Sequence, residues 1–86
     1  MIIKKELIKR DIAGEVFLVP VGKSMYDSNG LFILTELGAF IWELLPDAAG
    51  EDDIVTAVLK EYEVDEATAR VDTAAFLHKL REMEIL

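Results

Sequence analysis

The spacing of apolar residues along this chain changes from strand-like to helix-like near residue 35. Before that point, apolar residues form short runs at Glu15–Pro20 and Leu31–Leu34, rich in the β-branched and aromatic residues that strands favour. From Leu37 onward they recur three and four positions apart, as on one face of a helix. The pattern therefore predicts a small sheet followed by helices.

The first part of the chain predicts three strands joined by turns. We place them at Leu7–Ile12, Glu15–Pro20 and Leu31–Leu34. Ala13-Gly14 is typical of a tight turn, and Asn29-Gly30 is a strong turn signal because both residues tolerate positive φ. Short connections of this kind indicate an antiparallel meander.

The second part predicts three helices with recognisable ends. The first runs from Glu36 to Leu45, with Thr35 as N-cap, and stops at Pro46. The second opens with Glu51-Asp52-Asp53, whose charges suit a helix N-terminus, and the third begins after Asp65. The expected buried stripes are Leu37, Phe40, Ile41, Leu44 and Leu45; Ile54, Val55, Val58, Leu59 and Tyr62; and Ala69, Thr73, Phe76, Leu77 and Leu80.

Three strands followed by two short helices and a longer third predict one α+β domain over residues 1–86, with a winged helix-turn-helix-like topology. A chain of this size buries a limited share of its surface, yet 52% of its residues are hydrophobic. Two interpretations stay open: a helix-rich core that uses much Ala, Leu and Val, or an exposed apolar binding patch.

Charge and composition exclude several functions. The net charge is −8, and residues 47–86 carry four Lys or Arg against eleven Asp or Glu, which argues against nucleic-acid binding. Absence of cysteine excludes disulfides, thiol catalysis and Cys-ligated zinc. We find neither a signal peptide nor an apolar run of membrane-spanning length, so we expect a soluble cytoplasmic protein without membrane association.

No motif points to catalysis, a metal or a cofactor. His78 is the single histidine and is expected on the surface, without companions for a triad or a zinc site. Glu51-Asp52-Asp53 lacks the spacing of a calcium loop, and Gly22-Lys23-Ser24 lacks the first glycine of a phosphate loop. Trp42 is expected in the core. We therefore predict a protein that is not an enzyme and holds no cofactor.

What remains is a surface for an extended peptide. If the third strand is a sheet edge, its free N–H and C=O groups can pair with an added strand, beside the third helix. The alternative is an edge that is solvated or covered by the N-terminal residues. The predicted wall residues are Leu31, Phe32, Ile33 and Leu34 on the strand, and Val71, Asp72, Ala75 and Lys79 on the helix.

Several short segments, in this order, match one known family over nearly the whole chain. They are Arg10-Asp11, Gly14–Leu18, Leu31–Thr35, Ile41–Leu45, Ile54-Val55, Leu59, Tyr62, Asp72, Phe76-Leu77, Leu80 and Ile85-Leu86. The chain resembles the coenzyme PQQ synthesis protein D (PqqD-like) family, whose members are also called RiPP recognition elements. It differs from the typical family sequence at Thr35 (Asn), Thr73 (Val) and Glu84 (Gly), which leaves the subfamily open.

The resemblance implies a peptide chaperone in natural product biosynthesis. Such proteins bind the leader segment of a ribosomally synthesised precursor peptide and present it to a modifying enzyme, such as a radical SAM enzyme or a leader protease. It also adds Phe76 to the predicted contact residues. The alternative function is an acidic winged-helix scaffold that docks a partner enzyme or regulator without binding peptide or DNA. A homodimer paired through the exposed edge is a further alternative.

Overall fold

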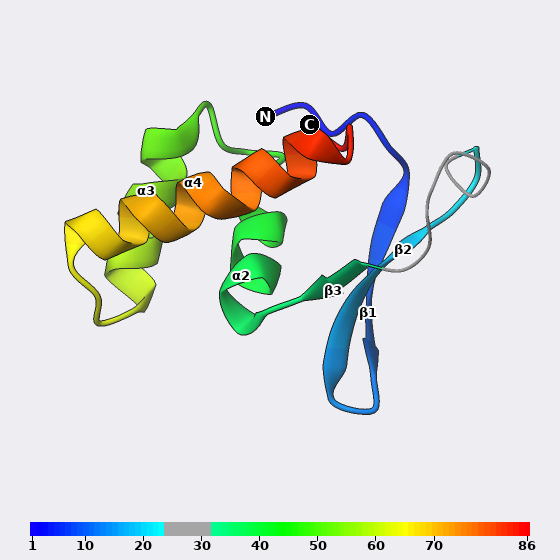
Figure 1. Ribbon diagram of the computed structural model, residues 1–86, viewed down its shortest axis with the longest axis horizontal. Coiled ribbons are helices and arrows are strands. Elements are labelled where there is room, and N and C mark those ends of the chain that lie inside the picture. The colour runs from blue at the N-terminus through cyan, green and yellow to red at the C-terminus, as the bar shows by residue number, and fades with distance from the viewer. Residues whose placement is uncertain (24–31) are drawn as a thin grey trace.

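The computed structural model describes residues 1–23 and 32–86 and shows a sheet followed by helices (Figure 1). The strands are β1 (Leu7–Ile12), β2 (Glu15–Pro20) and β3 (Phe32–Leu34), and the helices are α2 (Glu36–Leu44), α3 (Glu51–Glu61) and α4 (Glu66–Glu82). The predicted α+β class and element order are confirmed. The predicted turn at Asn29-Gly30 and the first residue of the predicted third strand, Leu31, lie outside the described residues.

The β1–β2 hairpin fixes the register of the sheet. Ala13 and Gly14 have φ values of 54° and 84°, the positive pair that a two-residue type I′ turn requires. The turn places Ile12 opposite Glu15, and the pairing continues to Leu7 opposite Pro20. β3 then adds to β2 in antiparallel orientation, so the sheet order is β1-β2-β3 and the predicted meander is confirmed.

Side-chain caps begin two of the helices where the sequence predicted them. The Thr35 hydroxyl accepts a hydrogen bond from the Gly38 N–H at 3.0 Å, and the Asp65 carboxylate accepts one from the Thr68 N–H at 2.7 Å. Each bond satisfies one of the N–H groups that the first helical turn leaves unpaired. Because only Thr35 separates β3 from α2, the strand and the helix are held at a fixed angle.

The core lies mainly between the three helices and the inner face of the sheet. Trp42 is buried as predicted, and all three predicted stripes supply core residues. Lys4 donates its backbone N–H to the Ile85 carbonyl at 2.7 Å, which joins the two ends of the chain (Figure 1). The largest fully buried side chains are Leu18, Ile41, Leu45, Ile54, Val55, Val58, Thr73, Leu77, Leu80 and Ile85. Within the described segments, no helix is long and apolar enough to cross a membrane.

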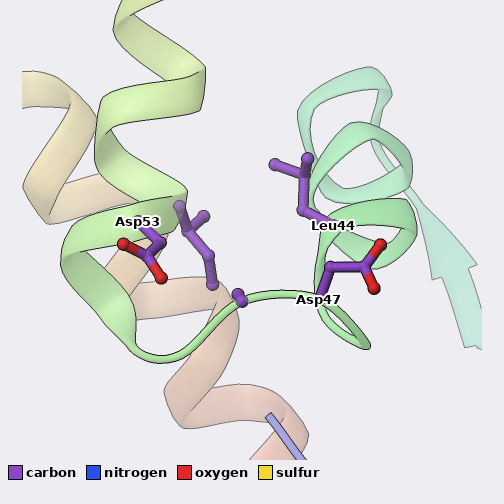
Figure 2. A pocket seen from close by; sticks show the side chains of 5 residues that line it. Leu44, Asp47 and Asp53 are labelled. Atoms are coloured by element: carbon purple, nitrogen blue, oxygen red, sulfur yellow. The ribbon is translucent and has the colours of Figure 1, made fainter.

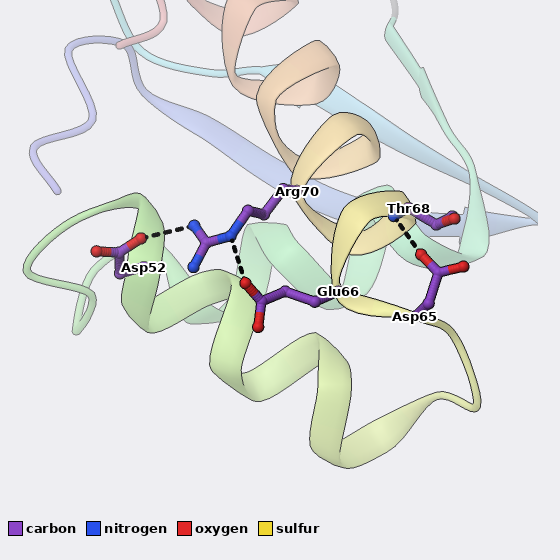
Figure 3. A network of polar contacts seen from close by, with 5 residues as sticks. All are labelled: Asp52, Asp65, Glu66, Thr68 and Arg70. Atoms are coloured by element: carbon purple, nitrogen blue, oxygen red, sulfur yellow. Dashed lines mark hydrogen bonds and ion pairs between the residues drawn. The ribbon is translucent and has the colours of Figure 1, made fainter.

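A polar network on the surface joins α3 to α4 (Figure 3). Arg70 Nη1 lies 2.8 Å from an Asp52 carboxylate oxygen, and its Nε lies 3.0 Å from a Glu66 oxygen. These two hydrogen bonds raise the pKa of Arg70. Asp52 in the first turn of α3 thus braces the two helices, and the acids of this turn suit the positive end of the helix dipole, in agreement with their predicted structural role.

Candidate functional site

The open edge of the sheet is formed by β3. This strand pairs with β2 on one side, and no other strand within residues 1–23 and 32–86 pairs with its opposite side. The predicted sheet edge is therefore present. An unpaired edge offers backbone donors and acceptors to an incoming extended segment.

The hydrogen-bond alternation identifies which residue faces that edge. Ile12 and Glu15 flank the two-residue turn and therefore form a hydrogen-bonded pair, and such pairs recur at every second position along the two strands. The Val21 N–H bond to the Glu6 carbonyl at 2.9 Å fits this alternation, because Glu6 lies six positions before Ile12. Residues 16 and 18 of β2 therefore direct their backbone groups towards β3, where their partners are Leu34 and Phe32. It follows that Ile33 directs its N–H and C=O away from β2, towards the open edge.

An aromatic pair joins this strand to α4. The rings of Phe32 and Phe76 are stacked, with centroids 6.5 Å apart and planes 13° apart. Lys79 places its ammonium nitrogen 5.3 Å from the centre of the Phe32 ring, within the range of a cation–π interaction. Both rings are only partly buried, so apolar surface stays accessible where β3 meets α4.

Gly38 leaves room for the Phe76 ring beside the first turn of α2. A Cβ atom at this position would lie 3.1 Å from Phe76 and 3.2 Å from the Thr35 hydroxyl, closer than side chains normally pack. Glycine lowers the stability of a helix relative to alanine, so its presence here indicates that a neighbouring contact needs the space. Gly38 was not among the predicted site residues, although a glycine inside the predicted first helix was the available signal.

The remaining predicted wall residues differ in position. Asp72, Ala75 and Lys79 are exposed on α4, and at about 100° per residue they lie on the side of Phe76 away from the core stripe. Val71 is 67% exposed and lies about 140° around the helix from Phe76, which makes it the most remote of the set. On the strand, the side chain of Leu34 is 5% exposed and belongs to the core. The assignment of these residues to a binding site stays a prediction.

Other polar groups show structural roles. His78 is exposed and its imidazole pairs with Glu82 one turn along α4, in agreement with its predicted surface position. Among the described residues, no three His, Cys, Asp or Glu side chains gather to hold a metal ion. A pocket of about 220 Å³ between α2 and α3 has Asp47 and Asp53 at its rim (Figure 2), but Asp53 already accepts a hydrogen bond from the Ala49 N–H at 2.8 Å.

Comparisons with known proteins agree with this geometry. The sequence profile of the family described as coenzyme PQQ synthesis protein D (PqqD) matches residues 15–86. The structure is similar to that of TbiB1, solved in complex with the TbiA(beta) leader peptide, with a TM-score of 0.75 and 31% sequence identity, covering 100% of this chain and 94% of TbiB1. Comparison with curated proteins gives no match.

A second solved structure shows the same fold. It is a lasso peptide synthetase B1 complexed with the leader peptide, with a TM-score of 0.71 and 22% sequence identity. The match covers 94% of this chain and 89% of the synthetase chain. The two similarities thus extend over all or nearly all of this chain.

Proposed function

Because the chain belongs to the coenzyme PQQ synthesis protein D (PqqD) family, we propose that it is a non-catalytic adaptor that binds the leader segment of a ribosomally synthesised precursor peptide. The observation that carries the proposal is the edge of β3 that no other described strand pairs with, towards which the Ile33 backbone points, beside the stacked rings of Phe32 and Phe76. The similarity to TbiB1, solved with a leader peptide, supports the same class of ligand.

The proposed mechanism is strand addition. A leader segment that pairs with β3 forms backbone hydrogen bonds with Ile33, and these bonds depend little on the peptide sequence. Side chains of an added strand alternate between the two faces of the sheet. On the inner face they meet Phe32, Phe76 and Lys79, so this face selects among leader sequences.

An adaptor of this kind acts by bringing its peptide to a second protein. We propose that this partner is a modifying enzyme, such as a radical SAM enzyme or a leader protease. When leader and enzyme are held on one adaptor, the effective concentration of the peptide reaches about the millimolar range. Modification then proceeds at low total peptide concentration without any catalytic group on the adaptor.

The test is an amide NMR titration with the short precursor peptides encoded beside this gene. We expect saturable shifts at residues 32–34 and along residues 68–80, with little change in α3. Absence of shifts with every such peptide would reject leader binding and favour the scaffold alternative. Shifts confined to other surfaces would reject β3 and α4 as the site.

Ala75→Glu tests the helix wall of the site. We expect leader affinity to fall at least about tenfold, since a carboxylate here must lose water when a strand packs against it. The melting temperature should stay nearly unchanged, because Ala75 is exposed. The matched control is Ala74→Glu, which adds the same charge one position away, on the side of α4 opposite to Phe76. Equal affinities of the two variants would remove Ala75 from the site.

A further inference from the structure

The outer face of the sheet is unusually apolar. Among the described residues, the alternation of side chains assigns to this face two charged residues, Arg10 and Glu15, and five apolar ones: Ile8, Ile12, Phe17, Val19 and Ile33. Ile8, Ile12 and Ile33 are 38%, 50% and 59% exposed. An antiparallel sheet with one face towards water normally carries polar residues there, so this composition is unexplained by folding alone. We call these seven residues the outer sheet face.

Four of the five apolar residues pair directly with one another across the strands. Val19 lies opposite Ile8, and Phe17 lies between Arg10 and Ile33 in one row across the three strands. Directly opposite residues on one face have their Cβ atoms about 5 Å apart, so neighbouring side chains are in contact. The surface thus reaches from β1 to the open edge at β3.

A pocket that borders the outer sheet face at Glu15 and Ile33, at the end of the sheet beside α2, adds a specific chemical feature. It has a volume of about 430 Å³ and lies where the hairpin turn approaches the start of α2. Its lining combines two acidic residues, Glu15 and Glu36, with the apolar residues Val16 and Leu34 from the inner side of the sheet, Ile33 from the outer sheet face and Ala39 from α2. A long cationic side chain fits such a lining, because its stem packs on apolar atoms while its charge meets the carboxylates.

We propose that the outer sheet face docks a partner protein that presents apolar side chains around one lysine or arginine, which enters the Glu15–Glu36 pocket. The inference rests on the proposed function in one respect: the partner is then the modifying enzyme. Ile33 belongs to both surfaces, since its side chain lies on the outer sheet face and its backbone faces the open edge. An enzyme docked there lies directly beside the leader strand.

Charge distinguishes this partner from a second copy of the chain. The net charge is −8, so two copies repel each other, and the face itself offers one cation, Arg10, against the acidic pocket. A partner with a basic patch gains from the same charges. Complementary potentials of this kind increase the association rate and make binding sensitive to salt.

The experiment measures binding of the purified modifying enzyme encoded beside this gene, by isothermal titration calorimetry. The test variants are Ile12→Asp, in the apolar surface, and Glu15→Lys, in the pocket. The matched control is Val64→Asp, which places the same charge on an exposed valine in the α3–α4 connection, far from the sheet (Figure 1). We expect each test variant to weaken enzyme binding at least about tenfold, and the control to bind like the wild type.

Parallel measurements separate this inference from the proposed function. Leader affinity and melting temperature should stay unchanged in all three variants, because none of these residues lies on the inner face. Wild-type affinity for the enzyme in both test variants, or no binding by the wild type, would overturn the proposal. A wild-type dimer in sedimentation that Ile12→Asp converts to a monomer would assign the face to a second copy and also overturn it. If the wild type binds the enzyme but binds no leader peptide, the proposed function is rejected and the docking surface is retained.

Discussion

The two halves of the molecule differ in how far their hydrophobic side chains are buried. We call residues 1–35 the strand half and residues 36–86 the helical half. Nearly all buried hydrophobic side chains belong to the helical half, and the strand half supplies only Leu18 and Leu34 among the described residues. Exposed large hydrophobics show the opposite distribution, with Ile2, Ile8, Ile12 and Ile33 in the strand half against Val64 and Val71. The helices thus hold the fold together while the strands present apolar surface and unpaired backbone.

This division has a physical basis in the length of β3. A strand of three residues followed directly by the capped helix α2 is anchored through Leu34 and the Thr35 cap. Its outward-facing residue, Ile33, contributes little to the core and is available for binding. Substitutions should therefore separate: those of buried side chains in the helices change stability, and those on the strand surfaces change affinity.

The largest expected effect is on the stability of the helical half. Leu77→Ala removes a fully buried side chain from α4, and we expect the free energy of unfolding to fall by about 2–5 kcal/mol. That is a large share of the total stability of a small domain, so the variant is close to unfolding at room temperature. Urea denaturation followed by circular dichroism measures the change.

The control lies in the strand half. Ile12→Ala removes a similar side chain that is 50% exposed, and its effect on the free energy of unfolding should stay within about 0.5 kcal/mol. Equal destabilisation by the two substitutions would show that the hairpin belongs to the cooperative core, and the division between the halves would be wrong.

Ile33→Pro tests whether the β3 edge serves binding rather than folding. The lost N–H faces the open edge, so the ladder to β2 stays intact and we expect only a small fall in melting temperature. Leader affinity should fall at least about tenfold, because one backbone donor is missing and the proline ring obstructs the edge. Ile33→Ala keeps the N–H and should retain more affinity than the proline variant.

A contrary result would change the register assigned to β3. If Ile33→Pro unfolds the protein while Phe32→Pro leaves it folded, the Phe32 N–H faces the open edge instead, and the phase inferred from the hairpin is wrong. Thermal unfolding of the two proline variants, compared side by side, decides between the two registers.

Thr73→Val tests the helical half with a substitution that we expect to increase its stability. Thr73 is fully buried on α4, and its hydroxyl finds no hydrogen-bond partner in the part of the chain that the structure describes. Replacing the hydroxyl by a methyl group removes a desolvated polar atom, so we expect a gain of about 1 kcal/mol in the free energy of unfolding. Thr73→Ser keeps the hydroxyl and should lower stability. A gain in the serine variant would contradict this account.

The elements of the fold were predictable because local signals and burial agree along this chain. The caps at Thr35 and Asp65, the Ala13-Gly14 turn and the helical stripes each appear where the sequence placed them. The first helix ends one residue earlier than predicted, at Leu44, with Leu45 as C-cap. Such signals act over a few residues, and a single sequence displays them directly.

The site was only partly predictable, because it depends on contacts between distant segments. The approach of Phe32 to Phe76, and the glycine at position 38 that allows it, joins three separate elements. The apolar outer sheet face requires the register of the sheet, which decides whether Phe17 and Ile33 point inward or outward. Alternation along one strand gives two faces, but the packing of the helices selects which face is buried.

The smallest expected effect concerns the pH dependence of the helical half. The hydrogen bond from the Thr68 N–H lowers the pKa of Asp65 below its ordinary value of 3.8. The charged cap therefore stabilises the fold fully above about pH 4, and this contribution is lost as the pH falls through the lower folded-state pKa. Asp65→Asn keeps a neutral capping group without the charge. We expect its melting temperature to lie slightly below that of the wild type near about pH 7, and the difference to vanish near about pH 2. A difference in melting temperature that persists at acid pH would attribute the effect to cap geometry rather than charge. Unchanged leader affinity in the variant would show that the Asp65 cap contributes to stability and not to binding.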